Sequence, residues 1–195
     1  MCSLASDLET GNSVYSERNE GVVKKEYLGD SYDIVKRFWA ESLRSFGQLY
    51  AHSRFVPQEI RGQYTAVTSI PILNASPRTP FGILLDPDTG IPLPTESTQK
   101  ATSKHAPLRF IVNLNDEFSP KYMICFDQSY HRKHALTREE QRERKRIYLR
   151  EHDLKSFYYV SHAPFLFVSR DAHVLDMIRA KLSSLGISSP RIEPS

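Results

Sequence analysis

The fold class follows from one stretch of sequence, Phe81-Gly-Ile-Leu-Leu-Asp-Pro-Asp-Thr-Gly90. A short apolar run leads directly to two carboxylates, Asp86 and Asp88, with a proline between them. Such a run, bounded by turn residues, is typical of a strand that is buried on both faces. In an open α/β sheet, ligands bind outside the carboxyl ends of the strands. The stretch therefore predicts a central strand, and it makes Asp86 and Asp88 candidate catalytic residues.

Strand and helix patterns alternate on both sides of this stretch. The other strong strand candidates are apolar or aromatic runs, at residues 122–126, 157–160 and 164–168. Helices are predicted by cap residues and apolar spacing, at residues 30–46, 138–150 and 171–185. Residues 64–73 and 110–114 fit either class. Alternating strands and helices favour a largely parallel sheet, so we expect an α/β fold of the three-layer, Rossmann-like kind with a mainly parallel sheet.

This single domain is expected to span residues 23–187, between a flexible N-terminal tail (1–22) and a C-terminal tail (188–195). The helix that begins at Asp30 carries an apolar stripe that is predicted to face the sheet, made of Ile34, Val35, Phe38, Trp39, Ser42 and Phe46. Lys36 lies at the edge of this stripe, where a lysine usually keeps its ammonium group in water.

Composition narrows the class of protein. The formal net charge is only +3, which does not indicate a strongly basic nucleic-acid binder, although it leaves room for a local basic face. The chain has no apolar run of the ~18 residues that a membrane span needs, so no membrane partner is expected. Because Cys2 and Cys125 are far apart and no secretory signal pattern is present, we expect a reducing, cytoplasmic setting. Composition leaves the oligomeric state open.

Four polar clusters are candidates for chemistry: residues 29–36, 86–90, 103–105 and 127–134. Two of them follow predicted strands, and Asp30, Asp86 and Asp127 are expected to gather around one cleft. The candidate residues fall into catalytic (Asp86, Asp88, Lys104, His131), cofactor-binding (Asp30, Asp33, Lys36) and substrate-binding (Asp127, Arg132, Lys133) groups, and no metal ligand is assigned.

Each cluster also has a plainer structural interpretation. Asp30 suits a helix cap, and Asp86 with Asp88 suits a turn closed by Gly90. The basic run 131–134 suits a solvated loop. The charged helix 138–150 suits a solvated face with internal ion pairs, or a surface that lies along phosphates. If Asp86 is functional, Asp86→Asn is expected to lower activity by orders of magnitude while changing stability by no more than ~1 kcal/mol.

The order of these motifs carries a resemblance. Gly29-Asp-x-x-Asp-x-x-Lys36, Leu-Asp-Pro-Asp-x-Gly90, Ser103-Lys104 and the apolar strand leading to Gln128–Arg132 resemble a family of uncharacterised bacterial proteins. The pattern of that family is Gly-Asp-x-x-Asp-x-x-Lys, Asp-Pro-Asp-Asn-Gly, Ser-Lys and Tyr-Gln-His-x-x-Arg. The chain is also distantly similar to Rossmann-fold methyltransferases that modify adenine in ribosomal RNA. That similarity implies that Asp86-Pro87 holds the target amine and that residues 30–36 lie near S-adenosylmethionine.

Two other function classes fit the same residues. Several carboxylates, a lysine and histidines beside a basic helix are suited to a metal-dependent phosphodiesterase using Mg²⁺ or Mn²⁺. A non-catalytic nucleic-acid-binding module with a degenerate site is the third class. In each case the expected partner is a nucleotide or nucleic acid, because basic side chains gather within and after the fourth cluster: Arg132, Lys133, His134, Arg142, Arg144 and Arg146.

Overall fold

The computed structural model describes residues 27–94, 102, 104–130 and 135–193. The expected N-terminal tail, 1–22, and the first residues of the expected domain lie outside these ranges. So do three candidate site residues, His131, Arg132 and Lys133. Among the helices of the described ranges, none has the length and apolar character that crossing a membrane requires.

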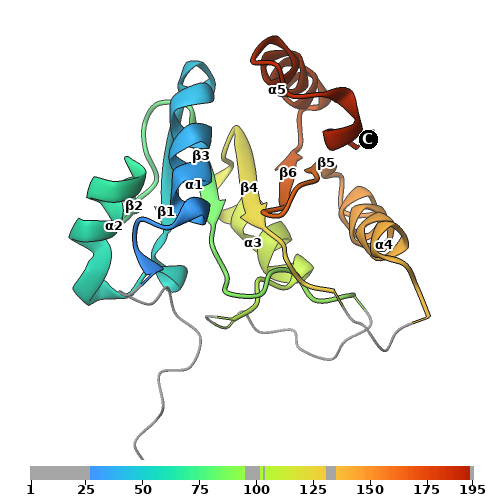
Figure 1. Ribbon diagram of the computed structural model, residues 1–195, viewed down its shortest axis with the longest axis horizontal. Coiled ribbons are helices and arrows are strands. Elements are labelled where there is room, and N and C mark those ends of the chain that lie inside the picture. The colour runs from blue at the N-terminus through green and yellow to red at the C-terminus, as the bar shows by residue number, and fades with distance from the viewer. Residues whose placement is uncertain (1–26, 95–101, 103, 131–134, 194–195) are drawn as a thin grey trace, which may run out of the picture.

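In the described residues the chain forms an α/β fold around a six-stranded mixed sheet of order β2-β1-β3-β4-β6-β5 (Figure 1). The strands are β1 (Gln48–His52), β2 (Ile72–Leu73), β3 (Phe81–Leu85), β4 (Tyr122–Phe126), β5 (Lys155–Tyr159) and β6 (Phe165–Ser169). Strands β2, β1, β3 and β4 run parallel, whereas β6 is antiparallel to both β4 and β5. The mainly parallel sheet is thus confirmed, with an antiparallel strand inserted near one edge.

The predicted central strands hold the positions expected of them. Every residue of β3 and of β4 is buried, and the two strands are neighbours in the middle of the sheet. Their continuous apolar sequence is what burial on both faces requires. Gly82 is needed in β3 because the Tyr122 ring of β4 lies against it, where a Cβ would be 2.4 Å from the ring.

Five helices of the described chain accompany the sheet: α1 (Ser31–Ser42), α2 (Arg61–Thr68), α3 (Leu108–Phe118), α4 (Arg138–Arg150) and α5 (Ala172–Ser184). Short 3-10 turns η2 to η5 cover Arg44–Phe46, Ser53–Phe55, Gln58–Ile60 and Ser189–Arg191. The two ambiguous segments are now assigned. Residues 64–73 contain the end of α2 and then β2, separated by Pro71, and residues 110–114 lie within α3.

Two apolar cores lie on opposite faces of the sheet. Leu84 packs in one core with side chains of α1, α2 and α5, whereas its neighbours Ile83 and Leu85 pack in the other with side chains of α3 and α4. Successive side chains of a strand point to opposite faces. The helices therefore cover both faces of the sheet (Figure 1), and the parallel strands β3 and β4 end at the same edge of it.

The buried face of α1 differs from the predicted stripe. Ile34 and Phe38 are 65% and 37% exposed, whereas Asp33 and Lys36 are 2% and 5% exposed. Trp39 belongs to the buried face, as expected. The helix is rotated relative to the prediction because Lys36 meets carboxylates inside the fold, which makes burial of its ammonium group tolerable.

The end of the chain also differs from the expectation of a tail. Within the expected tail, 188–195, turn η5 is followed by residues that hydrogen-bond to β5. Val160 donates its backbone N–H to the Arg191 carbonyl (2.7 Å), and Glu193 donates to the Tyr158 carbonyl (2.9 Å). The Glu193 carboxylate is paired with Arg142 of α4. Residues up to 193 therefore belong to the folded unit.

Candidate functional site

The site begins at the first turn of α1, which the sequence fixes locally. Asp30 caps the helix, and its Oδ1 accepts hydrogen bonds from the backbone N–H groups of Tyr32 (2.8 Å) and Asp33 (3.1 Å). Gly29 has a φ of +89°, which favours glycine, and its N–H donates to Asp33 Oδ2 (2.8 Å). The cap interpretation of Asp30 is thus confirmed, and the turn holds Asp33 facing inward.

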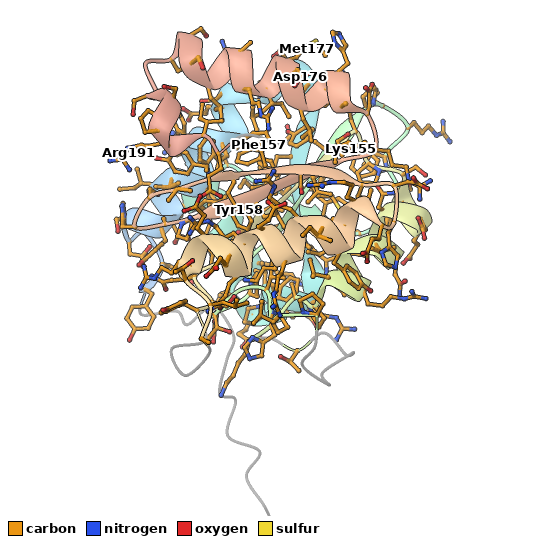
Figure 2. All side chains as sticks on the ribbon, turned by 90° about the vertical axis from the view of Figure 1, so that its right-hand side faces the viewer. Lys155, Phe157, Tyr158, Asp176, Met177 and Arg191 are labelled. Atoms are coloured by element: carbon orange, nitrogen blue, oxygen red, sulfur yellow. The ribbon has the colours of Figure 1, made fainter. Side chains whose placement is uncertain are left out.

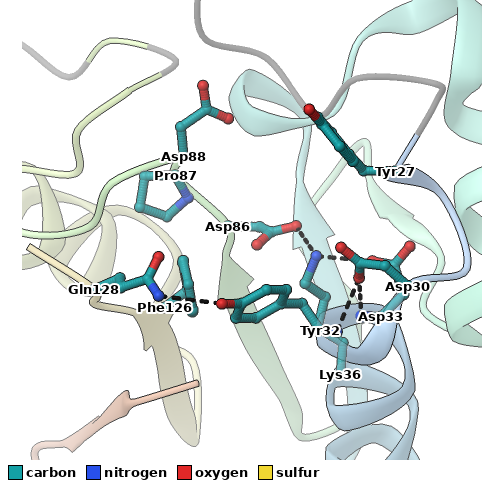
Figure 3. A pocket seen from close by; sticks show the side chains of 10 residues that line it. All are labelled: Tyr27, Asp30, Tyr32, Asp33, Lys36, Asp86, Pro87, Asp88, Phe126 and Gln128. Atoms are coloured by element: carbon teal, nitrogen blue, oxygen red, sulfur yellow. Dashed lines mark hydrogen bonds and ion pairs between the residues drawn. The ribbon is translucent and has the colours of Figure 1, made fainter. Parts of the chain in front are cut away.

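A buried ion cluster lies behind this turn. Lys36 Nζ is 2.8 Å from Asp33 Oδ1 and 2.6 Å from Asp86 Oδ2 (Figure 3). The side chains of Lys36 and Asp86 are each 6% exposed. Tyr64 of α2 donates its hydroxyl to Asp86 Oδ2 (3.4 Å). Asp86, directly after β3, is therefore held by side chains from two helices.

The protonation states follow from burial and from this pairing. Burial alone lowers the pKa of Lys36, but the carboxylates of Asp86 and Asp33 outweigh it, so the pKa is raised and the ammonium form is retained. Burial raises the pKa of Asp86, and the charge of Lys36 opposes that rise. Burial, followed by the charge of Asp86, raises the pKa of Tyr64, so this phenol stays protonated and donates.

A cavity of about 350 Å³ opens in front of the cluster. Its lining comes from the start of α1, the turn after β3 and the end of β4: Tyr27, Asp30, Tyr32, Asp33, Lys36, Asp86, Pro87, Asp88, Phe126 and Gln128. Five predicted site residues are thus brought together, and they are Asp30, Asp33, Lys36, Asp86 and Asp88. With four carboxylates and one ammonium group, the lining is acidic, which favours a ligand with positive charge or with N–H and O–H donors.

Asp86 presents one oxygen to this cavity. Lys36 and Tyr64 both contact Oδ2, and Oδ1 has no hydrogen-bond partner in the described part of the chain. The aromatic wall is ordered by contacts within the site. Gln128 Nε2 donates to the Tyr32 hydroxyl (3.1 Å), and the Tyr32 ring meets Phe126 edge to face at 5.5 Å.

Asp127 does not join this cavity, contrary to the expectation of one cleft. In the register of the sheet, Leu85 of β3 is opposite Cys125 of β4. Asp86 comes one residue after Leu85, whereas Asp127 comes two residues after Cys125. Since successive side chains alternate between the faces, the two carboxylates point to opposite sides of the sheet.

Asp127 is instead the centre of a second buried cluster. Its Oδ2 accepts from Lys145 Nζ of α4 and from the Tyr158 hydroxyl of β5, each at 2.7 Å. Its Oδ1 accepts from the backbone N–H groups of Ile91 (2.9 Å) and Ser129 (3.3 Å). With both oxygens occupied, Asp127 ties the loops after β3 and β4 to α4 and β5. These contacts give Asp127 a structural role, and it also lines a separate cavity of about 770 Å³ beside α4, so its substrate-binding role stays a prediction.

Lys104 lies apart from the cavity lining. Its carbonyl accepts hydrogen bonds from the Thr89 hydroxyl (2.6 Å) and from the Thr89 N–H (3.0 Å), so its backbone fixes the turn that follows Asp88. The Thr89 hydroxyl is also 2.7 Å from His105 Nδ1.

Three residues that sequence reasoning missed complete the site. Tyr64 lay in a segment of unclear class, and Tyr32 and Phe126 drew no attention as wall residues. Two of them could have been found only from their place in the sequence beside a polar cluster. Tyr32 lies within the first cluster, and Phe126 directly precedes the fourth.

The arrangement bears on metal binding. In the described ranges no group of three or more His, Cys, Asp or Glu side chains is placed to hold a metal ion. Between Asp33 and Asp86, the position that a cation would take is filled by Lys36 Nζ. These carboxylates therefore suit an internal ammonium group better than Mg²⁺ or Mn²⁺.

Comparison of the chain with protein-family models, with curated proteins and with solved structures finds no match.

Proposed function

We propose that this chain is a three-layer, Rossmann-like enzyme that transfers a methyl group to an amino group of a nucleotide or nucleic acid. The observation that carries the proposal is the geometry of Asp86. This carboxylate follows a central strand, its Oδ2 is fixed by Lys36 and Tyr64, and its Oδ1 is left for a ligand in a cavity with aromatic walls. Ligands of open α/β sheets bind at this edge.

The chemistry asked of Asp86 is orientation. S-adenosylmethionine supplies an electrophilic methyl group when bound. Asp86 Oδ1 would accept an N–H hydrogen bond from the target amine and so aim the nitrogen lone pair along the line of attack. An amine held by a preformed carboxylate needs little reorganisation during the reaction, which is the main source of electrostatic catalysis. The rings of Tyr32 and Phe126 offer stacking surfaces for a base.

The negative charge of the cavity lining supports S-adenosylmethionine as the methyl donor. The cavity lining holds the carboxylates of Asp30, Asp33, Asp86 and Asp88 against the single ammonium group of Lys36. Such a lining attracts the sulfonium and amino groups of the methyl donor and opposes a phosphate inside the cavity. The phosphodiesterase alternative has less support, because it needs a metal where the described residues place Lys36.

The nucleic-acid part of the proposal rests on fewer cations than the sequence indicated. Arg142 is paired with Glu193, and Arg146 is largely buried and paired with Glu143. Arg144 is exposed. A phosphate-binding surface is therefore expected at Arg144 rather than along the whole of α4.

Ligand binding tests the first half of the proposal. Thermal unfolding is measured with S-adenosylmethionine, S-adenosylhomocysteine, AMP, Mg²⁺ and Mn²⁺ at constant ionic strength. A ligand at one hundred times its Kd adds about 2.7 kcal/mol, which raises Tm by about 5–10 °C for a domain of this size. We expect the two S-adenosyl compounds to produce such a shift. A shift with Mg²⁺ or Mn²⁺ alone would support the phosphodiesterase, and no shift with any ligand would contradict the donor site.

Methyl transfer tests the second half. Incorporation of labelled methyl groups into nucleotides, DNA and RNA is compared for the wild type, Asp86→Asn and Asp116→Asn. Asp116 is a matched control because it is an exposed aspartate of α3, paired with Arg170. Asp86→Asn should lower the rate by about 10²-fold or more while donor binding persists, and Asp116→Asn should leave both unchanged. Full activity in Asp86→Asn would refute the role given to this carboxylate.

A further inference from the structure

Strand β5 forms one edge of the sheet, and only part of that edge is covered. The backbone groups of Arg191 and Glu193 hydrogen-bond to those of Val160 and Tyr158. The backbone N–H and C=O groups of Tyr158 and Val160 therefore point away from β6. Ser156 lies two residues before Tyr158 on the same strand, so its backbone N–H and C=O also point away from β6. No described residue forms a β-ladder with Ser156 on that side. Figure 2 looks onto this edge, with β5 between α5 and α4.

A cavity of about 270 Å³ lies at the uncovered part of the edge. Its lining is almost entirely cationic or polar: Arg146, Arg150, Leu154, Lys155 and Ser156. Lys155 is exposed and has no carboxylate partner in the described ranges. The Ser156 hydroxyl likewise has no hydrogen-bond partner among the described residues. The cavity therefore offers a backbone N–H, a hydroxyl and three cationic side chains to one small ligand.

Arg146 supplies an independent sign that an acceptor belongs here. Its side chain is 10% exposed, and Nη1 is 3.2 Å from the Glu143 carboxylate. Its Nε is buried and has no hydrogen-bond partner in the described chain. Leaving a buried donor of a charged group without an acceptor is destabilising. An orphaned donor of this kind requires an explanation, and an anion is one of the usual ones.

A fourth cation approaches from the other face of the sheet. Arg179 of α5 lies with its guanidinium 4.8 Å from the centre of the Phe157 ring of β5. Burial, with the like charge of Arg146, lowers the pKa of Arg179, and Asp176 acts in the opposite direction. The positive charge of Arg146 therefore also acts on the opposite face of β5.

We propose that the uncovered edge of β5 is a binding site for a phosphate dianion, either free or at the end of a phosphomonoester. The cavity cations Arg146, Arg150 and Lys155 stand against the carboxylate of Glu143. The local excess of two positive charges matches a dianion, and arginine is the residue best suited to bind tetrahedral oxyanions in pairs of hydrogen bonds. The site is separate from the acidic cavity after β3 and does not depend on the function proposed for it.

The test measures phosphate binding in the folded chain. Thermal unfolding and calorimetry are carried out with sodium phosphate against sodium chloride at equal ionic strength, and then with phosphoserine as the phosphomonoester. The variant is Arg150→Gln/Lys155→Gln, because both side chains are exposed and folding should be preserved. The control is Arg37→Gln/Arg170→Gln, which removes the same charge from exposed positions elsewhere.

We expect phosphate to raise the Tm of the wild type above its value in chloride. Arg150→Gln/Lys155→Gln should bind phosphate at least about tenfold more weakly than the wild type, and Arg37→Gln/Arg170→Gln should bind it as the wild type does. Equal binding of phosphate and phosphoserine identifies the free dianion as sufficient, and tighter binding of phosphoserine identifies the ester. Equal effects of phosphate and chloride, or unchanged binding by the variant, would overturn the proposal. Tighter binding of a single-stranded oligonucleotide at the same residues would overturn it in favour of a nucleic-acid surface.

Discussion

Replacement of Lys36 by methionine is the sharpest test of how the site is held together. Methionine keeps an unbranched apolar side chain but removes the ammonium group that lies 2.8 Å from Asp33 and 2.6 Å from Asp86. Two carboxylates are then left facing each other inside the protein. We expect Lys36→Met to be much less stable than the wild type. If the loss of folding free energy reaches the top of the range worked out below, the variant should fail to fold.

The magnitude follows from burial. The three side chains are between 3% and 6% exposed, so solvent does not screen the interaction. Removing one partner of a buried ion pair costs about 3–5 kcal/mol, a large part of the roughly 5–15 kcal/mol that holds a domain together. The adjacent Arg37 is the control. Its pair with Glu41 is 54% and 63% exposed, so Arg37→Gln should cost below about 0.5 kcal/mol.

The loss should also depend on pH. Burial raises the pKa of Asp86 above its ordinary value of 3.8, and Lys36 opposes this rise. Without Lys36 the folded-state pKa of Asp86 rises further, toward a neutral carboxyl. A group whose pKa is raised by folding contributes stability below the unfolded pKa and loses it as pH rises through the folded value. The deficit of Lys36→Met should therefore be small near pH 3.8 and grow above it.

Urea unfolding of the wild type, Lys36→Met and Arg37→Gln at about pH 4.5 and pH 8 measures both effects. A triple variant, Asp33→Asn/Lys36→Met/Asp86→Asn, should recover part of the stability because no charge remains buried. A loss under about 1 kcal/mol at pH 8, or a loss that does not change with pH, would refute the view that Lys36 neutralises this cluster.

Four smaller perturbations test the surroundings of the site and the packing of the fold. Asp127→Asn, which leaves Lys145 without its buried carboxylate, should cost about 3–5 kcal/mol in urea unfolding and leave binding of S-adenosyl compounds intact in the folded fraction. Gly90→Ala should lower stability by more than about 1 kcal/mol, because φ is +115° and the new Cβ would lie 2.5 Å from Asp127 Oδ1. Gly62 lies in α2 with open space around it, so Gly62→Ala should instead raise stability by about 0.5–1 kcal/mol. Thr137→Ala removes a capping box and should lower Tm by about 2–4 °C, corresponding to ~1 kcal/mol. A cost for Gly62→Ala equal to that of Gly90→Ala, or no cost for Asp127→Asn and Thr137→Ala, would contradict these assignments.

Much of the fold could be predicted because its signals are local. Continuous apolar runs identified β3 and β4, side-chain caps identified the starts of α1 and α4, and an amphipathic pattern identified α5. The two-residue β2 is too short to produce a pattern. The buried face of α1 escaped prediction for a different reason. Asp33 and Lys36 look like surface residues until Asp86, distant in sequence, is known to lie beside them.

The candidate site was predictable in so far as its residues share one edge of the sheet. Asp30, Asp33, Lys36, Asp86 and Asp88 meet there because α1 begins, and β3 ends, at that edge. The position of Asp127 depended on register, which no local pattern in β3 or β4 fixes. Burial of Asp86 and its pairing with Lys36 lead us to expect a larger loss of stability from Asp86→Asn than the sequence alone indicated. Loss of that pair should cost about 1.5–3 kcal/mol, because Lys36 retains Asp33.

The pairing of residues 191–193 with β5 has a consequence for how this protein behaves in concentrated solution. Exposed sheet edges are templates for aggregation, and natural proteins shorten, cover or charge them. Here one outer strand, β2, has only two residues, and the other, β5, is covered along half its length and flanked by arginines and a lysine. Removing residues 189–195 would uncover the edge of the sheet at Tyr158 and Tyr159. Such a truncated chain should associate edge to edge and form aggregates.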